Sequence, residues 1–258
     1  MQRRIFCLAI IFLIISNITT IVAQDDTILI TVSSTMDKII FDGKWSHRTE
    51  WKQSSDNIFS YNEDTVIHLR TAHQDNFIYI FVDSVSDTHL DKEKDSAMIC
   101  FDNNNDKSSL PDSNDYCFMT TLDGKESFIY QGNSSLALQN FKKLTNSENF
   151  IGIGGVSDQN DRYSNIPHPS YEFKIPTNIT GRSNAYGFYL AVYDAHSESV
   201  YSWPQTTTED PLQVPSPRIW GNLVSPDNSL PEFSWPILTL LPSILFVTYL
   251  TRFRIKII

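Results

Sequence analysis

The segments Thr65-Val-Ile-His-Leu-Arg-Thr71 and Phe77-Ile-Tyr-Ile-Phe-Val-Asp83 are the most strand-like part of the chain, and the polar residues His73-Gln-Asp-Asn76 separate them. β-Branched and aromatic residues dominate both segments, as is typical of strands. Residues 77–83 are apolar on both alternating faces, which indicates a central strand covered on both sides. The two segments therefore predict an antiparallel pair in the middle of a sheet.

Short segments of the same kind recur along residues 24–224. They number about ten, turn residues separate them, and almost no long amphipathic helix is found among them. This pattern predicts an all-β fold, an antiparallel β-sandwich of the immunoglobulin-like or jelly-roll type, and favours it over a barrel. We expect residues 24–224 to form this one domain.

Residues 1–23 have the features of a signal peptide. Arg3 and Arg4 precede an apolar run from Ile5 to Ile15, and Ala23 stands at a suitable cleavage site. We expect the chain to be exported; the alternative is that the segment stays as a membrane anchor.

Cys100 and Cys117 flank a loop that is rich in Asp and Asn. The third cysteine, Cys7, lies in the expected signal peptide, so these two are the only pair in the exported chain. In an oxidising compartment such a pair predicts a disulfide. Closing a loop of this size stabilises the fold by about 3 kcal/mol in the chain-entropy estimate.

The same loop contains Asp102, Asn104 and Asp106 at alternating positions, so that their oxygens can converge on one hard cation. Three further carboxylates are available as additional ligands: Asp95, Asp112 and Asp115. We expect a structural Ca²⁺ site here. The alternative is a solvated acidic loop that needs no ion.

A second apolar stretch lies near the C-terminus. The 18 residues Phe233–Leu250 carry no charge and would form a helix about 27 Å long, close to the hydrocarbon thickness of a bilayer. Arg252, Arg254 and Lys256 follow, which favours a cytoplasmic C-terminus. The sequence predicts a linker at residues 225–232, a transmembrane or sorting helix at residues 233–251, and a basic cytoplasmic tail at residues 252–258.

The triplet Pro231-Glu232-Phe233 stands at the start of this stretch. Together with the apolar helix and the basic tail, it resembles the C-terminal sorting signals of archaeal surface proteins. The resemblance implies recognition by a sorting protease-transpeptidase and replacement of the helix by a lipid-type anchor. A retained membrane helix is the alternative, and both imply attachment to the cell surface with the domain outside.

Acidic residues predominate between the two ends. Residues 24–230 contain 15 Lys and Arg against 29 Asp and Glu, a net charge of −14. Such a surface repels nucleic acid, which excludes nucleic-acid binding.

Asn133-Ser-Ser and Asn178-Ile-Thr are acceptor sequences for N-glycosylation, as expected of exposed loops in an exported protein.

Three parts of the chain carry a family resemblance. They are Asp42-Gly-Lys-Trp45 through Glu50-Trp51, the strand pair within residues 66–83, and Asp95-Ser-Ala-Met-Ile-Cys-Phe-Asp102 with its continuation. Together they resemble the carbohydrate-binding-module family 9 and DOMON-like extracellular β-sandwiches. Members of this group bind sugars, often with structural calcium, or bind b-type haem in electron transfer. The resemblance implies packing roles for Trp45 and Trp51, and it supports the fold more than the function.

A sugar site needs an aromatic platform that stacks on a pyranose ring, with polar groups beside it. The candidate ligand contacts are Trp203, Trp220, Tyr189 and Tyr193. For each of them the alternative is packing in the core or an ordinary surface position.

Two other chemistries have less support. Haem needs axial ligands held on strands, and the available side chains are Met98, Met119, His68, His73 and His168. For catalysis, the six histidines show no metal-ligand spacing and no Gly-x-Ser-x-Gly turn occurs, although a glycosidase-type carboxylate pair stays open.

We therefore predict a non-catalytic, surface-anchored extracellular domain that binds carbohydrate or another cell-envelope glycan. The alternatives are a b-type haem-binding electron-transfer ectodomain and a structural envelope protein.

Overall fold

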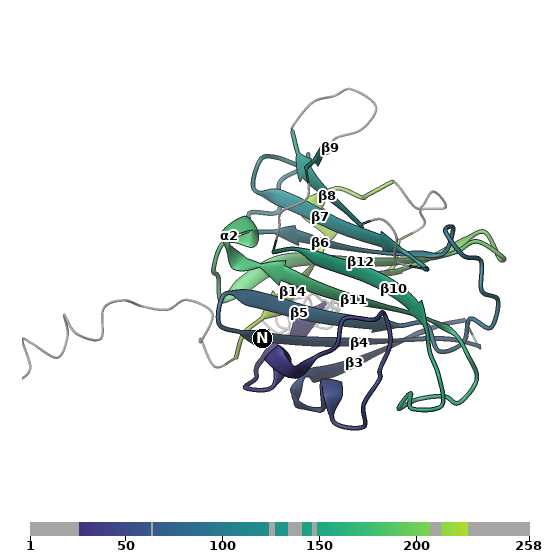
Figure 1. Ribbon diagram of the computed structural model, residues 1–258. Coiled ribbons are helices and arrows are strands. Elements are labelled where there is room, and N and C mark those ends of the chain that lie inside the picture. Colours follow the sequence, from purple (N-terminus) through teal and green to yellow (C-terminus); the bar gives the residue numbers. More distant parts are fainter. Residues whose placement is uncertain are drawn as a thin grey trace, which may run out of the picture.

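The computed structural model describes residues 26–62, 64–123, 127–133, 141–145, 149–206 and 213–226. Within these ranges the chain consists almost entirely of β-strands in two sheets that pack face to face (Figure 1), which confirms the predicted sandwich. The expected signal peptide, apolar helix, basic tail and most of the linker lie outside the described residues. In the part of the chain that is described, no helix has the length and apolar character needed to cross a membrane.

The larger sheet has eight strands in the order β1-β14-β12-β6-β7-β8-β9, with β13 also paired to β12. All of these pairs are antiparallel except β1–β14. Its strands are β1 (Thr27–Leu29), β6 (Ser96–Asp102), β7 (Asp115–Thr121), β8 (Ser127–Gly132), β9 (Phe141–Leu144), β12 (Ala185–Asp194), β13 (Ser199–Trp203) and β14 (Gly221–Val224).

The smaller sheet has six strands in the order β10-β11-β5-β4-β2, with β3 also paired to β4. Here only β2–β4 is parallel. Its strands are β2 (Thr31–Val32), β3 (Ser55–Tyr61), β4 (Thr65–Gln74), β5 (Phe77–Asp83), β10 (Ile151–Val156) and β11 (Pro169–Pro176). Four short helices complete the described elements: η1 (Met36–Lys38), η2 (Glu50–Gln53), α2 (Thr177–Thr180) and η3 (Pro217–Ile219).

Strand β5 is central, as its composition predicts, because β4 and β11 pair with its two edges. Ile78, Ile80 and Val82 join the core between the sheets, and Tyr79 and Phe81 lie on the opposite face. All five side chains are buried. An apolar residue is therefore favoured at every one of these positions, and the alternation between polar and apolar residues disappears.

The outer face of the smaller sheet is covered by the segment between β2 and β3. Trp45 and Trp51 are buried there, and both pack against Phe81. The buried carboxylate of Glu172 on β11 holds this segment, since it accepts hydrogen bonds from Trp51 Nε1 at 3.1 Å and from the backbone N–H of Gly43 at 2.8 Å. The packing roles expected of the two tryptophans are confirmed.

The outer face of the larger sheet has a second apolar layer, to which the residues before β14 contribute. Cys100 and Cys117 are directly opposite each other on β6 and β7 and form the predicted disulfide, with their Cα atoms 4.0 Å apart. Both are buried in this layer together with Met98, Tyr189 and Trp220. The disulfide therefore joins two neighbouring strands within a packed layer.

Candidate functional site

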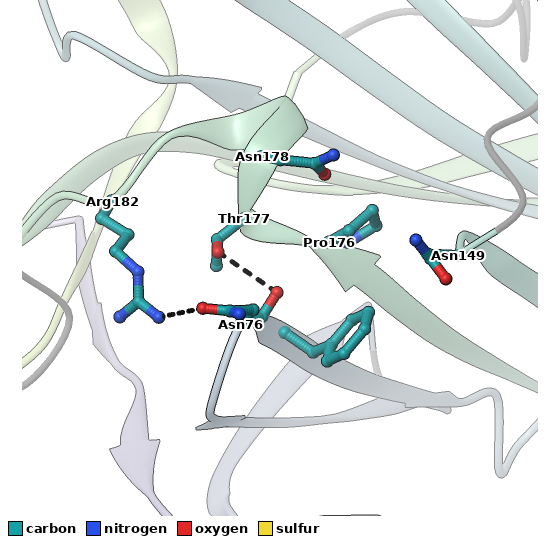
Figure 2. A pocket seen from close by; sticks show the side chains of 7 residues that line it. Asn76, Asn149, Pro176, Thr177, Asn178 and Arg182 are labelled. Carbon is teal, nitrogen blue, oxygen red and sulfur yellow. Dashed lines mark hydrogen bonds between the residues drawn. The ribbon is translucent and has the colours of Figure 1, made fainter.

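A pocket of about 440 Å³ opens where strand β11 runs into helix α2 (Figure 2). Its volume is in the range of small-molecule sites. Seven residues from four separate parts of the chain line it: Asn76, Phe77, Asn149, Pro176, Thr177, Asn178 and Arg182.

Hydrogen bonds between the β4–β5 turn and the α2 region fix the shape of this pocket (Figure 2). The backbone oxygen of Asn76 accepts from the backbone N–H of Thr177 at 2.9 Å and from its hydroxyl at 3.2 Å. The guanidinium of Arg182 donates to the side-chain oxygen of Asn76 at 2.5 Å and to the backbone oxygen of Asp75 at 2.7 Å. The pocket is therefore braced across the β5–β11 pair before any ligand arrives.

The lining offers hydrogen bonds and one aromatic ring. The ring is that of Phe77, which is half-buried and has the ammonium of Lys174 4.1 Å from its centroid. The side chain of Asn178 is exposed and has no partner among the described residues. None of the seven lining residues is an acid, a histidine or a cysteine. These groups can hold a polar ligand, but they supply neither a general acid or base nor a thiolate.

Sequence reasoning missed this pocket. Asn76 reads as a turn residue, Phe77 as the first residue of a core strand, and Asn178 as a glycosylation site. These residues lie close together because Phe77 pairs with Pro176, and no local sequence pattern reveals this register. The one available signal is the cluster of amide side chains next to predicted strand ends.

Asn178 connects the pocket with the expected glycosylation. Both predicted acceptors, Asn133 and Asn178, are exposed, as the modification requires. A glycan on Asn178 would stand at the edge of the pocket, because this side chain lines it. Glycosylation itself stays a prediction.

The four aromatic candidates do not form one platform. Tyr189 and Trp220 stack on each other with ring centroids 6.2 Å apart, but they are only 1% and 3% exposed. Trp203 packs against Phe59 and against the core between the sheets. Tyr193 is half-buried near the end of β12. Their role as ligand contacts stays a prediction, and the stacked pair presents no open ring face to solvent.

The haem candidates are divided between the sheets. Met98 and Met119 are directly opposite each other on β6 and β7 of the larger sheet. His68 and His73 belong to β4 of the smaller sheet, and His168 directly precedes β11. The haem alternative also stays a prediction.

The acidic loop after Cys100 is folded largely by its own hydrogen bonds. Asp102 is fully buried and accepts from the backbone N–H groups of Asp106 and Lys107, at 3.3 and 3.0 Å. The other two predicted calcium ligands, Asn104 and Asp106, have exposed side chains. The structure thus places only one of the three predicted ligands inside the hairpin.

The further ligands expected for this loop lie at different ends of strand β6. Asp115 pairs with Asp102 across the hairpin and is fully buried. Asp95 precedes β6, whereas Asp102 ends it, so about seven residues of strand, or about 23 Å, separate them. Asp95 as an additional ligand at this loop is therefore wrong, because an extended strand holds it at the opposite end.

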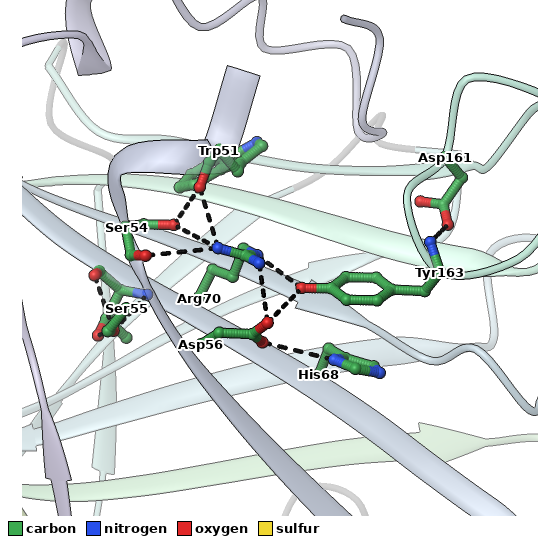
Figure 3. A network of polar contacts seen from close by, with 9 residues as sticks. Trp51, Ser54, Ser55, Asp56, His68, Arg70, Asp161 and Tyr163 are labelled. Carbon is green, nitrogen blue, oxygen red and sulfur yellow. Dashed lines mark hydrogen bonds and ion pairs between the residues drawn. The ribbon is translucent and has the colours of Figure 1, made fainter. Parts of the chain in front are cut away.

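A buried arginine organises the outer face of the smaller sheet (Figure 3). Arg70 is 5% exposed, and its guanidinium carbon lies 5.1 and 5.6 Å from the ring centroids of Trp45 and Tyr163. Figure 3 shows the polar partners around this side chain. Its guanidinium donates to Asp56 at 2.8 Å and to the Tyr163 hydroxyl at 2.6 Å. The His68 ring stacks on the ring of Tyr163, with the two centroids 3.6 Å apart. Because the arginine is enclosed by these partners, we assign the network to packing of the loop that contains Tyr163.

No protein-family model matches this chain, and no curated protein matches it. Among solved structures, the chain is similar to a carbohydrate-binding module of family 9 from Caldicellulosiruptor kristjanssonii in complex with cellotriose, with 18% sequence identity and a TM-score of 0.47 over 77% of this chain and 93% of that chain. The structure of a family 9 module from the same organism in complex with glucose is similar over 77% of this chain and 95% of that chain, with 16% identity and a TM-score of 0.44. This is the group that the sequence resembles, and the likeness is one of fold.

Proposed function

We propose that this chain is a non-catalytic extracellular binding domain and that the pocket beside α2 holds a short saccharide or the end of a glycan chain. The observation that carries the proposal is the lining itself: three amide side chains, one guanidinium, one hydroxyl and one aromatic ring in a single pocket of about 440 Å³.

This combination suits the chemistry of a sugar. Each sugar hydroxyl both donates and accepts a hydrogen bond, and an amide side chain offers a donor and an acceptor side by side. Among the described residues, the side-chain amide of Asn178 has no hydrogen-bond partner, and the side-chain amide nitrogen of Asn76 donates to no acceptor. The Phe77 ring can meet the apolar C–H face of a pyranose. None of the described residues that line the pocket is an acid, which favours binding over hydrolysis.

The proposed location is the cell surface. Support comes from the signal-like residues 1–23, the uncharged stretch at residues 233–250, and the net charge of −14 between the ends. The saccharide would then belong to the cell envelope or to the surroundings of the cell.

The test is saccharide binding by the purified full chain, produced in a host that does not glycosylate it. A panel of mono- to trisaccharides and intact envelope polysaccharide is screened by ligand-observed NMR, and each hit is quantified by calorimetry. Phe77→Ala and Asn178→Ala alter the pocket, whereas Tyr193→Ala removes a half-buried aromatic residue elsewhere. Thermal melts establish that each variant is folded.

We expect at least one saccharide to bind, with affinity reduced about tenfold or more by each pocket variant and retained in Tyr193→Ala. One lost hydrogen bond or stacking contact of about 1.4 kcal/mol produces such a change. Binding that is lost in Tyr193→Ala and kept in both pocket variants would place the site on the larger sheet instead. An absence of binding across the whole panel would refute the proposal.

A further inference from the structure

Asp83, Asp161 and His168 form a cluster at the end of the β5–β11 pair that lies opposite the pocket. Asp83 is the last residue of β5, His168 directly precedes β11, and Asp161 belongs to the loop between β10 and β11. One ligand atom from each residue lies within 4.8 Å of the others. Asp83 and His168 are 0% exposed, and Asp161 is 8% exposed. Three side chains of the types that bind metal ions therefore meet in a buried place.

The tautomer of His168 follows from its hydrogen bonds. Nδ1 lies 2.7 Å from the backbone oxygen of Ile166 and 2.9 Å from the hydroxyl of Ser157. A carbonyl oxygen only accepts, so Nδ1 carries the proton. In a neutral imidazole, Nε2 is then a bare acceptor that points at the carboxylates. A histidine that donates from one nitrogen to a carbonyl and presents the other to acidic groups is oriented as metal-bound histidines are.

The contact between His168 and Asp83 leaves further oxygens of the cluster without a partner. Nε2 lies 2.6 Å from Oδ1 of Asp83, close enough for an ion pair when the imidazole is protonated, and both atoms are buried. Oδ2 of Asp83 and Oδ2 of Asp161 are buried and unpartnered. Two buried carboxylate oxygens without a partner therefore lie beside the contact between His168 and Asp83. Unsatisfied buried polar groups are costly, and several of them in one place need an explanation.

The buried negative charge of the cluster also needs an explanation. With both carboxylates ionised, the cluster is negative whether or not the imidazole is protonated, and His168 is the only basic group paired with either carboxylate among the described residues. Buried charges are found paired or coordinated to a metal. A single divalent cation offsets this charge and can take one ligand atom from each of the three residues.

A serine-protease-like triad is the other arrangement that these residues suggest, because Ser157, His168 and Asp83 are in contact in that order. Ser157 is only 3% exposed, and its hydroxyl oxygen accepts the backbone N–H of His168 at 3.0 Å. A substrate carbonyl cannot reach a nucleophile in this position. Ser157 instead orients the imidazole ring.

We propose that Asp83, Asp161 and His168 bind one divalent transition-metal ion of the Zn²⁺ type, through Nε2 of His168 and a carboxylate oxygen of each aspartate. The imidazole ligand disfavours Ca²⁺ and Mg²⁺, which prefer oxygen, and suits Zn²⁺ and its neighbours. The ion joins the loop at residues 157–168 to the end of β5. Its role is structural, since the surrounding burial leaves no open approach for a substrate.

The test is zinc binding by the chelator-treated full chain, with ZnCl₂ as the only added ligand. We expect one Zn²⁺ per chain to survive desalting, and the affinity to fall at least about 100-fold in His168→Gln, which exceeds the loss of about 10- to 100-fold typical of an outer-shell change. His47→Gln is the matched control, because His47 is exposed and outside the cluster. Retention of zinc in His168→Gln at wild-type affinity overturns the proposal.

Two additional measurements keep the test decisive. His89 and His196 stack 3.6 Å apart and offer a competing surface site, so His89→Gln must keep the bound zinc; its loss there overturns the proposal. If His168→Gln does not fold, Co²⁺ is bound to the wild-type chain instead. X-ray absorption that shows one nitrogen ligand among oxygens supports the site, and an all-oxygen shell overturns it.

Discussion

Asp102 and Asp115 are paired directly across strands β6 and β7, and both side chains are fully buried. Asp102 accepts two backbone N–H groups, whereas one carboxylate oxygen of Asp115 has no partner. Burial, and the charges of the neighbouring carboxylates, raise the pKa of Asp115 to about 7. The end of the disulfide hairpin therefore holds an acid whose charge changes near neutral pH.

The first prediction concerns pH. Asp115 has a pKa of about 7 in the folded chain, against about 3.9 when unfolded. The folded state then binds a proton that the unfolded state has already released, so this contribution to stability is present at low pH and is lost as pH rises toward 7. We expect urea denaturation of Asp115→Asn between pH 4.5 and 8 to show a smaller fall in the free energy of unfolding than the wild type shows. Asp37→Asn, a change at an exposed aspartate, should leave the slope unaltered; equal slopes in all three proteins would contradict the assignment.

The second prediction concerns calcium at the same hairpin. The calcium hypothesis from the sequence now rests on Asp102 and Asp115 rather than on the exposed Asn104. A bound Ca²⁺ would favour the ionised form of Asp115 and stabilise the folded chain by mass action. We expect millimolar Ca²⁺ at pH 7.5 to raise the melting temperature of the wild type and to have little effect on Asp115→Asn. A melting temperature that neither Ca²⁺ nor a chelator shifts would reject the hypothesis.

Strand β5 and the disulfide show which parts of the structure the sequence alone can predict. The apolar faces of residues 77–83 and the spacing of Cys100 and Cys117 are local signals, and they predict a central strand and a disulfide correctly. The meeting of Asp83 with Asp161 and His168 depends instead on how β5 and β11 pair over a separation of about 90 residues. The pocket at Phe77 and Pro176 depends on the same register. A single sequence contains no local pattern that reports such pairings, so both sites could be found only in the structure.

The third prediction concerns the disulfide. Cys100 and Cys117 are 17 positions apart, and opening this loop costs about 3 kcal/mol in the chain-entropy estimate. We expect the double variant Cys100→Ala/Cys117→Ala to lose about that much of its free energy of unfolding, measured by urea denaturation. A reducing agent should destabilise the wild type by a similar amount and leave the double variant unchanged. Equal sensitivity of both proteins to the reducing agent would contradict this prediction.

The fourth prediction concerns the covering segment on the smaller sheet. Trp51 donates from Nε1 to the buried carboxylate of Glu172, and phenylalanine keeps most of the packing but removes this donor. We expect Trp51→Phe to cost about 1–3 kcal/mol, because the buried carboxyl group of Glu172 loses a hydrogen-bond partner. Trp220→Phe is the matched control, since its Nε1 donates to the neutral backbone oxygen of Pro215 at 3.0 Å, and it should cost less. Equal losses in the two variants would show that the buried carboxyl group of Glu172 is no more sensitive to losing its donor than a backbone carbonyl oxygen.

The fifth prediction tests how Ser157 positions the proposed metal ligand. Its hydroxyl lies 2.9 Å from Nδ1 of His168 and accepts the backbone N–H of the same residue, so it holds the ring without touching an ion at Nε2. We expect Ser157→Ala to lower the zinc affinity about tenfold, as outer-shell changes do, and Ser157→Thr to restore it because the hydroxyl remains. The measurement is the rise in melting temperature between the chelated and the zinc-saturated chain, which scales with affinity and separates the metal effect from any general loss of stability. If Ser157→Ala lowers both melting temperatures equally, the hydroxyl supports only the loop and has no part in zinc binding.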